Sequence, residues 1–318
     1  MLEALPIPAA CRLLHGPGRR PLPVVMCIDV EPDDRQVGGD GPQHWPAFEE
    51  MAARLETLRG RLSAASGSPV AFTWFLRMDS QVEEAWGSST WVVERYGTLL
   101  GELEARGDEL GVHAHPWRRN GAGWIVDYRP EWVRRSAERA LDAFASALGR
   151  TCRAYRAGDR SLNGDILPTL AARGVEVDLT VEPDLPPHAM LPAGELTAGP
   201  LPDFRGAPRQ PYRSSPGRFP RRDPAGGTQP LLIPIFGVPR PDRWSMALLL
   251  PAPPSMFSPR LLAEVARRRP AVLPFVLRTD PAHLGPWDHM AANLEHLARV
   301  GARFVTASAA ADAVAPAR

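Results

Sequence analysis

Short apolar runs alternate with helix-like patterns along this chain, and that alternation limits the folds open to it. Val24–Val30, VVMCIDV, is a continuous apolar run typical of a strand buried on both faces. Residues 46–65 then place apolar side chains at helical spacing, and Val70–Leu76 is again β-branched and aromatic. Strand–helix–strand alternation favours a parallel sheet with helices on its outside.

The alternation extends to the end of the chain. Strands are expected at residues 24–30, 70–76, 107–115, 152–157, 175–181, 231–236, 271–277 and 302–306. Helices are expected at residues 46–65, 90–105, 130–148, 258–269 and 287–300, and a further helix follows Asn163 and ends at about residue 172. Seven or eight strands in 318 residues fit one (β/α) barrel, which typically takes about 250 residues. Functional side chains of such barrels lie at the C-terminal ends of the strands.

Two stretches fall outside this alternation. Residues 1–23 are rich in proline, glycine and arginine without a clear period, so we interpret them as a lead-in to a single barrel domain spanning 24–318. Residues 183–230 form a proline-rich insertion with many arginines and a few aromatic residues. It could cover the mouth of the barrel and contact a sugar or phosphate, or it could be a flexible solvated loop.

Charge and cysteine content exclude several classes of protein. Lysine plus arginine number 37 against 36 for aspartate plus glutamate, so no net field attracts nucleic acid or an anionic membrane. Three cysteines without a CxxC pair argue against a secreted disulfide scaffold. The N-terminus lacks the order of a signal peptide, and no run of about 18 apolar residues could span a membrane. We therefore expect a soluble, cytoplasmic protein of unspecified oligomeric state, with a periplasmic location reached by an unusual route as the alternative.

Two histidines stand one residue apart at the end of the third predicted strand. His113 and His115 follow the apolar residues Leu110 to Val112. In an extended backbone, residues i and i+2 point to the same face, so both imidazoles can converge on one point. This arrangement is typical of metal ligands, and the alternative is a pair of surface histidines at a strand end.

Four carboxylates lie within six positions at the end of the first predicted strand: Asp29, Glu31, Asp33 and Asp34. Like charges this close repel one another, so a positive group is expected to hold them. A metal ion would do so. The alternative is a solvated acidic loop, although Asp29 belongs to the apolar strand itself.

Polar residues follow several predicted strands at the same end. Asp29 and Glu31 follow the first, Arg77 and Asp79 the second, His113 and His115 the third, Arg156 the fourth, and Arg278 and Asp280 the seventh. C-terminal ends of parallel barrel strands meet at one rim. Two carboxylates and two histidines are a ligand set for Zn²⁺ or a similar divalent ion. The sequence therefore predicts metal-assisted hydrolysis of an amide or ester.

Three short motifs stand in order along the chain. One strand ends in Ile28-Asp29-Val30-Glu31, another in Glu109-Leu110-Gly111-Val112-His113 followed by His115-Pro116, and another in Tyr155-Arg156-Ala157-Gly158. They resemble the motifs of the polysaccharide deacetylases of the NodB-homology group, from about residue 24 to 306 apart from the insertion. The resemblance implies an irregular (β/α) barrel that removes N- or O-acetyl groups from sugars with a bound divalent metal, for which Zn²⁺ is our first expectation.

The resemblance also implies roles for individual residues. Asp29 would act as the base and Arg156 would steady it. Val30 stands where the family has its metal-binding aspartate, so Glu31, or one of the aspartates at 33 and 34, would replace it. The two histidines would bind the metal, at a spacing of two where the family usually has four.

The family's last motif places an acid histidine after the seventh strand, where this chain has Leu277-Arg278-Thr279-Asp280. Without a general acid, hydrolysis slows by about 10²–10⁴ unless Asp280 or the nearby His283 takes over. Two alternatives therefore stand beside a deacetylase. One is a sugar-binding protein on the same fold that has lost its chemistry, and the other is a hydrolase of another C–N bond, such as a cyclic amide.

Several polar residues are expected to contact the substrate: Arg77, Asp79, Trp117, Tyr212, Arg213 and Arg278. Trp117 follows the second histidine by two residues and could line the pocket. Arginine forks match phosphate well, so the basic insertion favours a phosphorylated or nucleotide-linked acetylated sugar.

Overall fold

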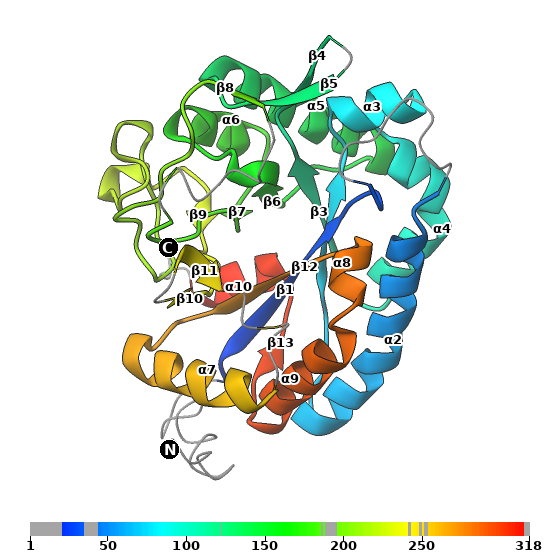
Figure 1. Cartoon of the computed structure of the whole chain (residues 1–318), viewed down its shortest axis with the longest axis vertical. Helices are drawn as coiled ribbons and strands as arrows, with labels where there is room; N and C mark the ends of the chain where they lie inside the picture. The colour runs from blue at the N-terminus through cyan, green and yellow to red at the C-terminus, as the bar shows by residue number, and fades with distance from the viewer. Residues whose placement is uncertain are drawn as a thin grey trace.

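A computed structural model shows a curved sheet at the centre of the chain, with helices around it (Figure 1). It describes residues 21–34, 44–121, 123–185, 187, 196–240, 243–247, 250 and 254–314. The predicted lead-in segment lies outside the described residues up to residue 20.

The central sheet is parallel throughout. It contains β1 (Pro23–Val30), β2 (Thr73–Arg77), β3 (Glu109–Ala114), β6 (Ala154–Ala157), β7 (Val177–Asp178), β9 (Leu231–Leu232), β12 (Leu273–Arg278) and β13 (Arg303–Phe304). Their order is β12-β1-β2-β3-β6-β7-β9, with β13 beside β1. Beyond β9, the backbone N–H of Phe236 donates to the Pro274 carbonyl of β12 at 3.0 Å, which brings the two sides of the sheet together. The predicted irregular (β/α) barrel of seven to eight parallel strands is confirmed.

Helices cover the outer face of the sheet (Figure 1). They are α2 (Pro46–Ser66), α4 (Trp91–Ala105), α5 (Pro130–Leu148), α6 (Leu167–Ala172), α7 (Pro254–Arg268) and α9 (Trp287–Arg299), close to the predicted ranges. In α5, Pro130 opens the first turn, and Gly149 ends the helix in the left-handed conformation at φ 65°. The apolar stripe of α5 that includes Val133 and Phe144 is buried.

Alternate residues of β1 face two different layers. Val24, Met26 and Ile28 pack in the outer core against the helices, whereas Val25 and Cys27 belong to the inner cluster. Because side chains alternate along a strand, the next residues on the inner face are those at 29 and 31. The inner faces of β2, β3, β6 and β12 likewise continue from buried residues to those at 77, 113, 156 and 278. The predicted polar residues therefore share one rim.

A short C-terminal helix, α10 (Ala307–Val314), closes the opposite end of the barrel. Its first backbone N–H donates to Thr73 Oγ1 at the start of β2 (2.9 Å). The N–H of Ser308 donates to the Glu109 carboxylate at the start of β3 (3.0 Å). A carboxylate at a helix N-terminus satisfies open N–H groups and complements the helix dipole.

Several elements were not predicted from the sequence. They are α3 (Ser80–Trp86), the hairpin of β4 (Trp117–Asn120) and β5 (Gly123–Asp127), β8 (Thr197–Ala198) beside β5, the hairpin of β10 (Val238–Arg240) and β11 (Arg243–Ala247), and α8 (Pro281–Leu284). Gly121 at the β4–β5 turn has φ 63°, and the pair Asn120-Gly121 is a hairpin signal. These elements interrupt the alternation of strands and helices, so a prediction based on that alternation misses them.

The fifth strand is shorter than its predicted range of 175–181. Oδ1 of Asp178 accepts the backbone N–H of Thr180 at 2.9 Å, and Oδ2 accepts its hydroxyl at 2.8 Å. The side chain thus takes the place of a strand partner and ends β7 after two residues.

Residues 196–230 of the predicted insertion pack against the barrel. Phe204 and Ser214 are fully buried, and Tyr212 forms an antiparallel bridge with Leu232 beside β9. Within the described residues, no helix is both long and apolar enough to cross a membrane.

Candidate metal-binding and catalytic site

Glu31, His113 and His115, here called the triad, bring three ligand atoms together at the C-terminal rim. Oε1 of Glu31 lies 3.4 Å from Nε2 of His113 and 3.9 Å from Nε2 of His115, and the two Nε2 atoms are 3.0 Å apart. A tetrahedral Zn²⁺ ion with bonds of about 2.0–2.1 Å separates its ligand atoms by about 3.3–3.4 Å. All three side chains are buried. Their spacing therefore suits one face of the coordination shell of a divalent ion.

Both histidine rings are held through Nδ1. Nδ1 of His113 lies 2.8 Å from the carbonyl oxygen of Arg156, and Nδ1 of His115 lies 2.7 Å from Oδ2 of Asp159. Because these oxygens accept, each Nδ1 carries the hydrogen and each Nε2 presents a lone pair. Two lone pairs that face each other at 3.0 Å repel unless a cation or a shared proton lies between them. The donor set therefore fits a bound metal.

The Asp159 carboxylate sits in an unusual turn that wraps around His115. Asp159 and Arg160 have φ values of 49° and 56°, a left-handed conformation that residues other than glycine rarely adopt. A Cβ atom on Gly158 would lie 2.3 Å from the His115 ring, so only glycine permits this approach. The indole N–H of Trp117 donates to Asp159 Oδ2 at 2.6 Å. It also lies 3.1 Å from His115 Nδ1, but that atom already carries a hydrogen.

Replacing Asp159 should weaken metal binding without removing a ligand. Loss of a carboxylate that orients a metal-binding histidine typically costs about 10–100-fold in metal affinity. We expect that range for Asp159→Ala, measured by competition with a chelator. Asp142→Asn, an exposed carboxylate on α5, should keep the wild-type affinity. An unchanged affinity in Asp159→Ala would show that the carboxylate does not orient the ring.

Asp29 lies beside the triad and is held by Arg156. Nε of Arg156 donates to Oδ1 and Oδ2 of Asp29 at 2.9 and 3.0 Å, and Nη1 donates to the Leu179 carbonyl at 2.7 Å. Oδ1 of Asp29 lies 3.9 Å from His113 Nδ1. The structure thus brings together the carboxylate and the arginine that the sequence suggested as base and partner.

Arg77 and Asp79, predicted to contact substrate, lie behind the triad and are fully buried. Arg77 Nε donates to Asp79 Oδ2 at 2.8 Å, Nη2 donates to Gln81, and Nη1 stands 3.8 Å from Glu31 Oε2. Asp79 caps α3 and accepts the backbone N–H of His115 at 3.1 Å. In this position the pair supports Glu31 and the backbone of His115.

The charges within the site shift its pKa values in opposite directions. Burial raises the pKa of Glu31, yet the neighbouring His113 and the Arg77 charge bring it well below its usual value. Burial lowers the pKa of His113, but the Asp29 and Glu31 carboxylates raise it overall. Burial and the Arg77 charge leave the pKa of His115 lowered.

The end of β12 carries three of the predicted residues. Nε of Arg278 pairs with Asp280 Oδ2 at 3.0 Å, and Asp280 Oδ1 accepts the backbone N–H of His283 at 3.1 Å, capping α8. Nδ1 of His283 accepts the backbone N–H of Arg278 at 2.9 Å, so the ring carries its hydrogen on Nε2. Burial and the Arg278 charge lower the pKa of His283. His283 is therefore arranged as a neutral hydrogen-bond donor.

Thr279 is a support residue that sequence reasoning missed. Its Oγ1 accepts the backbone N–H of Glu31 at 2.9 Å and donates to the Glu31 carbonyl at 3.0 Å. Asp33 accepts the N–H of Ala47 at the start of α2, and Asp34 is exposed. Among these carboxylates, the structure brings Glu31 to the histidines.

Three predicted substrate contacts remain, namely Trp117, Tyr212 and Arg213. Trp117 is buried behind His115 and Asp159. Tyr212 is buried in the insertion, and Arg213 donates to the Gln229 carbonyl there.

Comparisons with known proteins concern the fold. No protein-family model matches, and no curated protein matches. Among solved structures, this chain is similar in fold to polysaccharide deacetylases. A protein described as one, from Mycobacterium smegmatis, is 16% identical with a TM-score of 0.49, over 92% of this chain and 89% of that one.

Two further structures show similar chain paths. One is a 4-alpha-glucanotransferase from Thermococcus litoralis, with 17% identity and a TM-score of 0.47, over 93% of this chain and 39% of that one. The other is a CE4 family pseudoenzyme from Bacillus anthracis, with 10% identity and a TM-score of 0.41, over 91% of this chain and 65% of that one.

Proposed function

We propose that this protein is a metal-dependent hydrolase that removes the acetyl group from an N- or O-acetylated sugar. The observation that carries the proposal is the pair of facing Nε2 atoms beside Glu31, with Asp29 next to them. The reaction class follows from that chemistry, and the acetyl-sugar substrate from the resemblance of the strand-end motifs. We propose Zn²⁺ as the ion and the cytoplasm as the location.

Glu31, His113 and His115 would hold the ion, which when bound polarises the acyl carbonyl and lowers the pKa of a water molecule. Asp29 would accept a proton from the attacking water, with its carboxylate oriented by Arg156. His283 would donate an Nε2 hydrogen bond and not a proton, because its Nδ1 is occupied by a backbone N–H. We therefore propose that Asp29 also returns the proton to the leaving nitrogen or oxygen.

Acetate release tests the proposal. The purified protein would be stripped with a chelator, reloaded with Zn²⁺ and incubated with N-acetylated and O-acetylated mono- and oligosaccharides. We expect acetate release from the loaded protein, none from the stripped protein, and recovery when the ion is restored. A loaded protein that released no acetate from any of these sugars would refute the deacetylase.

One observation favours the alternative of a sugar-binding protein without turnover. The acid position after β12 is occupied by the Arg278–Asp280 ion pair, and both Asp280 oxygens contact protein groups. Binding of the sugars without acetate release would support this alternative. Hydrolysis of a cyclic amide in the same assay would instead support the hydrolase of another C–N bond.

A further inference from the structure

A series of hydrogen bonds connects a buried carboxylate outside the candidate site to His113 of the triad. The Thr180 hydroxyl donates to Oδ2 of Asp178 at 2.8 Å, and Thr180 Oγ1 accepts the backbone N–H of Ala157 at 2.7 Å. On the other side of that peptide group, the Arg156 carbonyl accepts the Nδ1 hydrogen of His113 at 2.8 Å. We call these groups the Asp178 network. It joins β7 to β3 through a single peptide group of β6.

The position of β6 in the sheet explains this connection. Strand β6 lies between β3 and β7, and the register places Arg156 opposite His113 and Tyr155 opposite Asp178. The C=O and N–H of a trans peptide point in opposite directions. The peptide between residues 156 and 157 therefore meets the imidazole on its β3 side and the Thr180 hydroxyl on its β7 side.

The hydrogen bonds of the Asp178 network all run in one direction. Asp178 and Thr180 are fully buried, and His113 and Ala157 are each only 2% exposed. Each donor points its hydrogen toward the Asp178 end, and hydrogen bonds aligned in this way polarise one another in a low-dielectric interior. The Asp178 charge thus makes the Thr180 oxygen a stronger acceptor and, through the peptide group, makes the Arg156 carbonyl a stronger acceptor for His113.

The two histidines of the triad differ in how a carboxylate reaches them. Nδ1 of His115 contacts the Asp159 carboxylate directly at 2.7 Å, whereas Nδ1 of His113 contacts a carbonyl. A carboxylate partner fixes a metal-binding imidazole and raises its basicity. Through Thr180 and one peptide group, Asp178 can give His113 the support that Asp159 gives His115.

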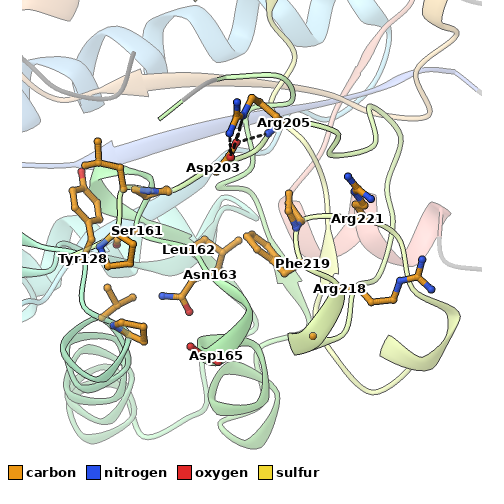
Figure 2. Close-up of a pocket in the computed structure, with 17 residues that line it drawn as sticks. Tyr128, Ser161, Leu162, Asn163, Asp165, Asp203, Arg205, Arg218, Phe219 and Arg221 are labelled. Atoms are coloured by element: carbon orange, nitrogen blue, oxygen red, sulfur yellow. Dashed lines mark hydrogen bonds and ion pairs between the residues drawn. The ribbon is translucent and has the colours of Figure 1, made fainter. Parts of the chain in front are cut away.

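The Asp178 network is enclosed by protein. A cavity of about 660 Å³ opens between α5, the turn after β6 and the insertion, and Figure 2 shows Leu162 and Phe219 close together in the middle of its lining. Among the described residues that line this cavity, none belongs to the Asp178 network. Since the network is also buried, its polar groups have to satisfy one another instead of water.

We propose that Asp178 and Thr180 are positioning residues that strengthen His113 as a metal ligand by polarising the peptide group between residues 156 and 157. The inference rests on the proposed function for the presence of the metal. It adds two residues that act on the triad from behind β6, through a backbone group.

Thr180→Val tests the inference, because valine has nearly the shape of threonine and lacks the hydroxyl. The first measurement is the NMR resonance of the His113 Nδ1 proton in the metal-stripped protein, assigned by its absence in His113→Ala. We expect it to move upfield, because a weaker acceptor leaves a weaker hydrogen bond. The second is Zn²⁺ affinity by competition with a chelator, which should fall about 10-fold, the lower end of the range for an orienting partner.

Two further variants separate the hydroxyl from the charge. Thr180→Ser keeps the hydroxyl and should restore both the resonance and the affinity. Asp178→Asn can still accept the Thr180 N–H, which Asp178 accepts at 2.9 Å, but its amide group cannot accept the hydroxyl hydrogen. It should shift the resonance in the same direction as Thr180→Val. Burial raises the pKa of Asp178 to about 7, so the measurements are made at about pH 8, where its carboxylate is ionised.

Thr73→Val is the matched control, because Thr73 has a similar environment at the opposite end of the barrel. It is fully buried, its Oγ1 accepts the backbone N–H of Ala307 at 2.9 Å, and its hydroxyl lies 3.4 Å from Oε2 of Glu109. The control should lower the melting temperature but leave the His113 resonance and the Zn²⁺ affinity unchanged. Thermal melting monitored by circular dichroism verifies that each variant is folded.

The outcomes separate this inference from the proposed function. A wild-type resonance or wild-type Zn²⁺ affinity in folded Thr180→Val, or an equal change in Thr73→Val, would overturn the inference. If Thr180→Val did not fold, an unshifted resonance in Asp178→Asn would do the same. Because the resonance is measured without metal, a wild-type protein that bound no Zn²⁺ or released no acetate would refute the hydrolase and leave the resonance to decide whether Asp178 acts on His113.

Discussion

Asp29→Asn is expected to lower the rate of acetate release by about 10²–10⁴, the usual worth of a general base. Asp29 stands beside His113, and both of its oxygens contact Arg156. The amide cannot accept a proton from water at neutral pH, but it has nearly the size of the carboxylate. The loss should therefore appear in kcat, measured with the Zn²⁺-loaded protein.

The Asp29→Asn variant also leaves the buried Arg156 without its counterion, so its folding has to be measured. Its metal content should remain near that of the wild type, because Asp29 is not part of the triad. Asp288→Asn, which removes an exposed carboxylate from α9, is the matched control and should have wild-type activity. A folded, metal-loaded Asp29→Asn protein with full activity would rule out Asp29 as the base.

His113→Ala and His115→Ala are each expected to purify without a bound divalent ion and without hydrolytic activity. Each change removes one of three ligand atoms that lie within 4.8 Å of one another. Losing a direct ligand should cost more than the 10–100-fold associated with an orienting partner. Elemental analysis should give about one ion per wild-type chain and close to none in either variant.

His289→Ala provides the comparison for both histidine variants, because His289 is exposed on α9. It should keep the wild-type metal content and activity. If both triad variants retained a full complement of metal, the ion would have to lie elsewhere. A wild-type protein that took up no Zn²⁺ after reconstitution would refute the metal-dependent mechanism.

The sequence was sufficient to predict the barrel and the rim, because both follow from periodicity. The inner face of β1 runs through Val25 and Cys27 to Asp29, and the pairing of β2 with β3 places Arg77 opposite His113. Once the strands are recognised as parallel, their polar ends have to meet. That rule grouped the carboxylates after the first strand with the two histidines, but it left open which of Glu31, Asp33 and Asp34 joins them.

The groups that orient the triad could not be found in this way. Asp159 lies in an irregular turn whose backbone has positive φ, and Thr279 reaches Glu31 across 248 positions of sequence. Neither belongs to a periodic pattern. The weak signal for Asp159 was its place directly after Gly158 at a strand end. The cavity lined by Leu162 and Phe219 could not be predicted either, because it depends on how the insertion folds back on the turn after β6.

The six-residue strand β3 contributes to the stability of the barrel at its first residue and to the candidate metal site near its end. Glu109 begins it and anchors α10 beneath the barrel, whereas His113 near its end belongs to the triad. Among the described residues, the Glu109 carboxylate bonds to Thr73 and Ser308 at the end of the barrel opposite the rim, so we expect substitutions in the triad to leave it in place. Over evolutionary time, a lineage could thus lose its chemistry by mutation of the rim while selection for a folded, ligand-binding protein continued. The same arrangement would let a new reaction arise there on an already stable scaffold.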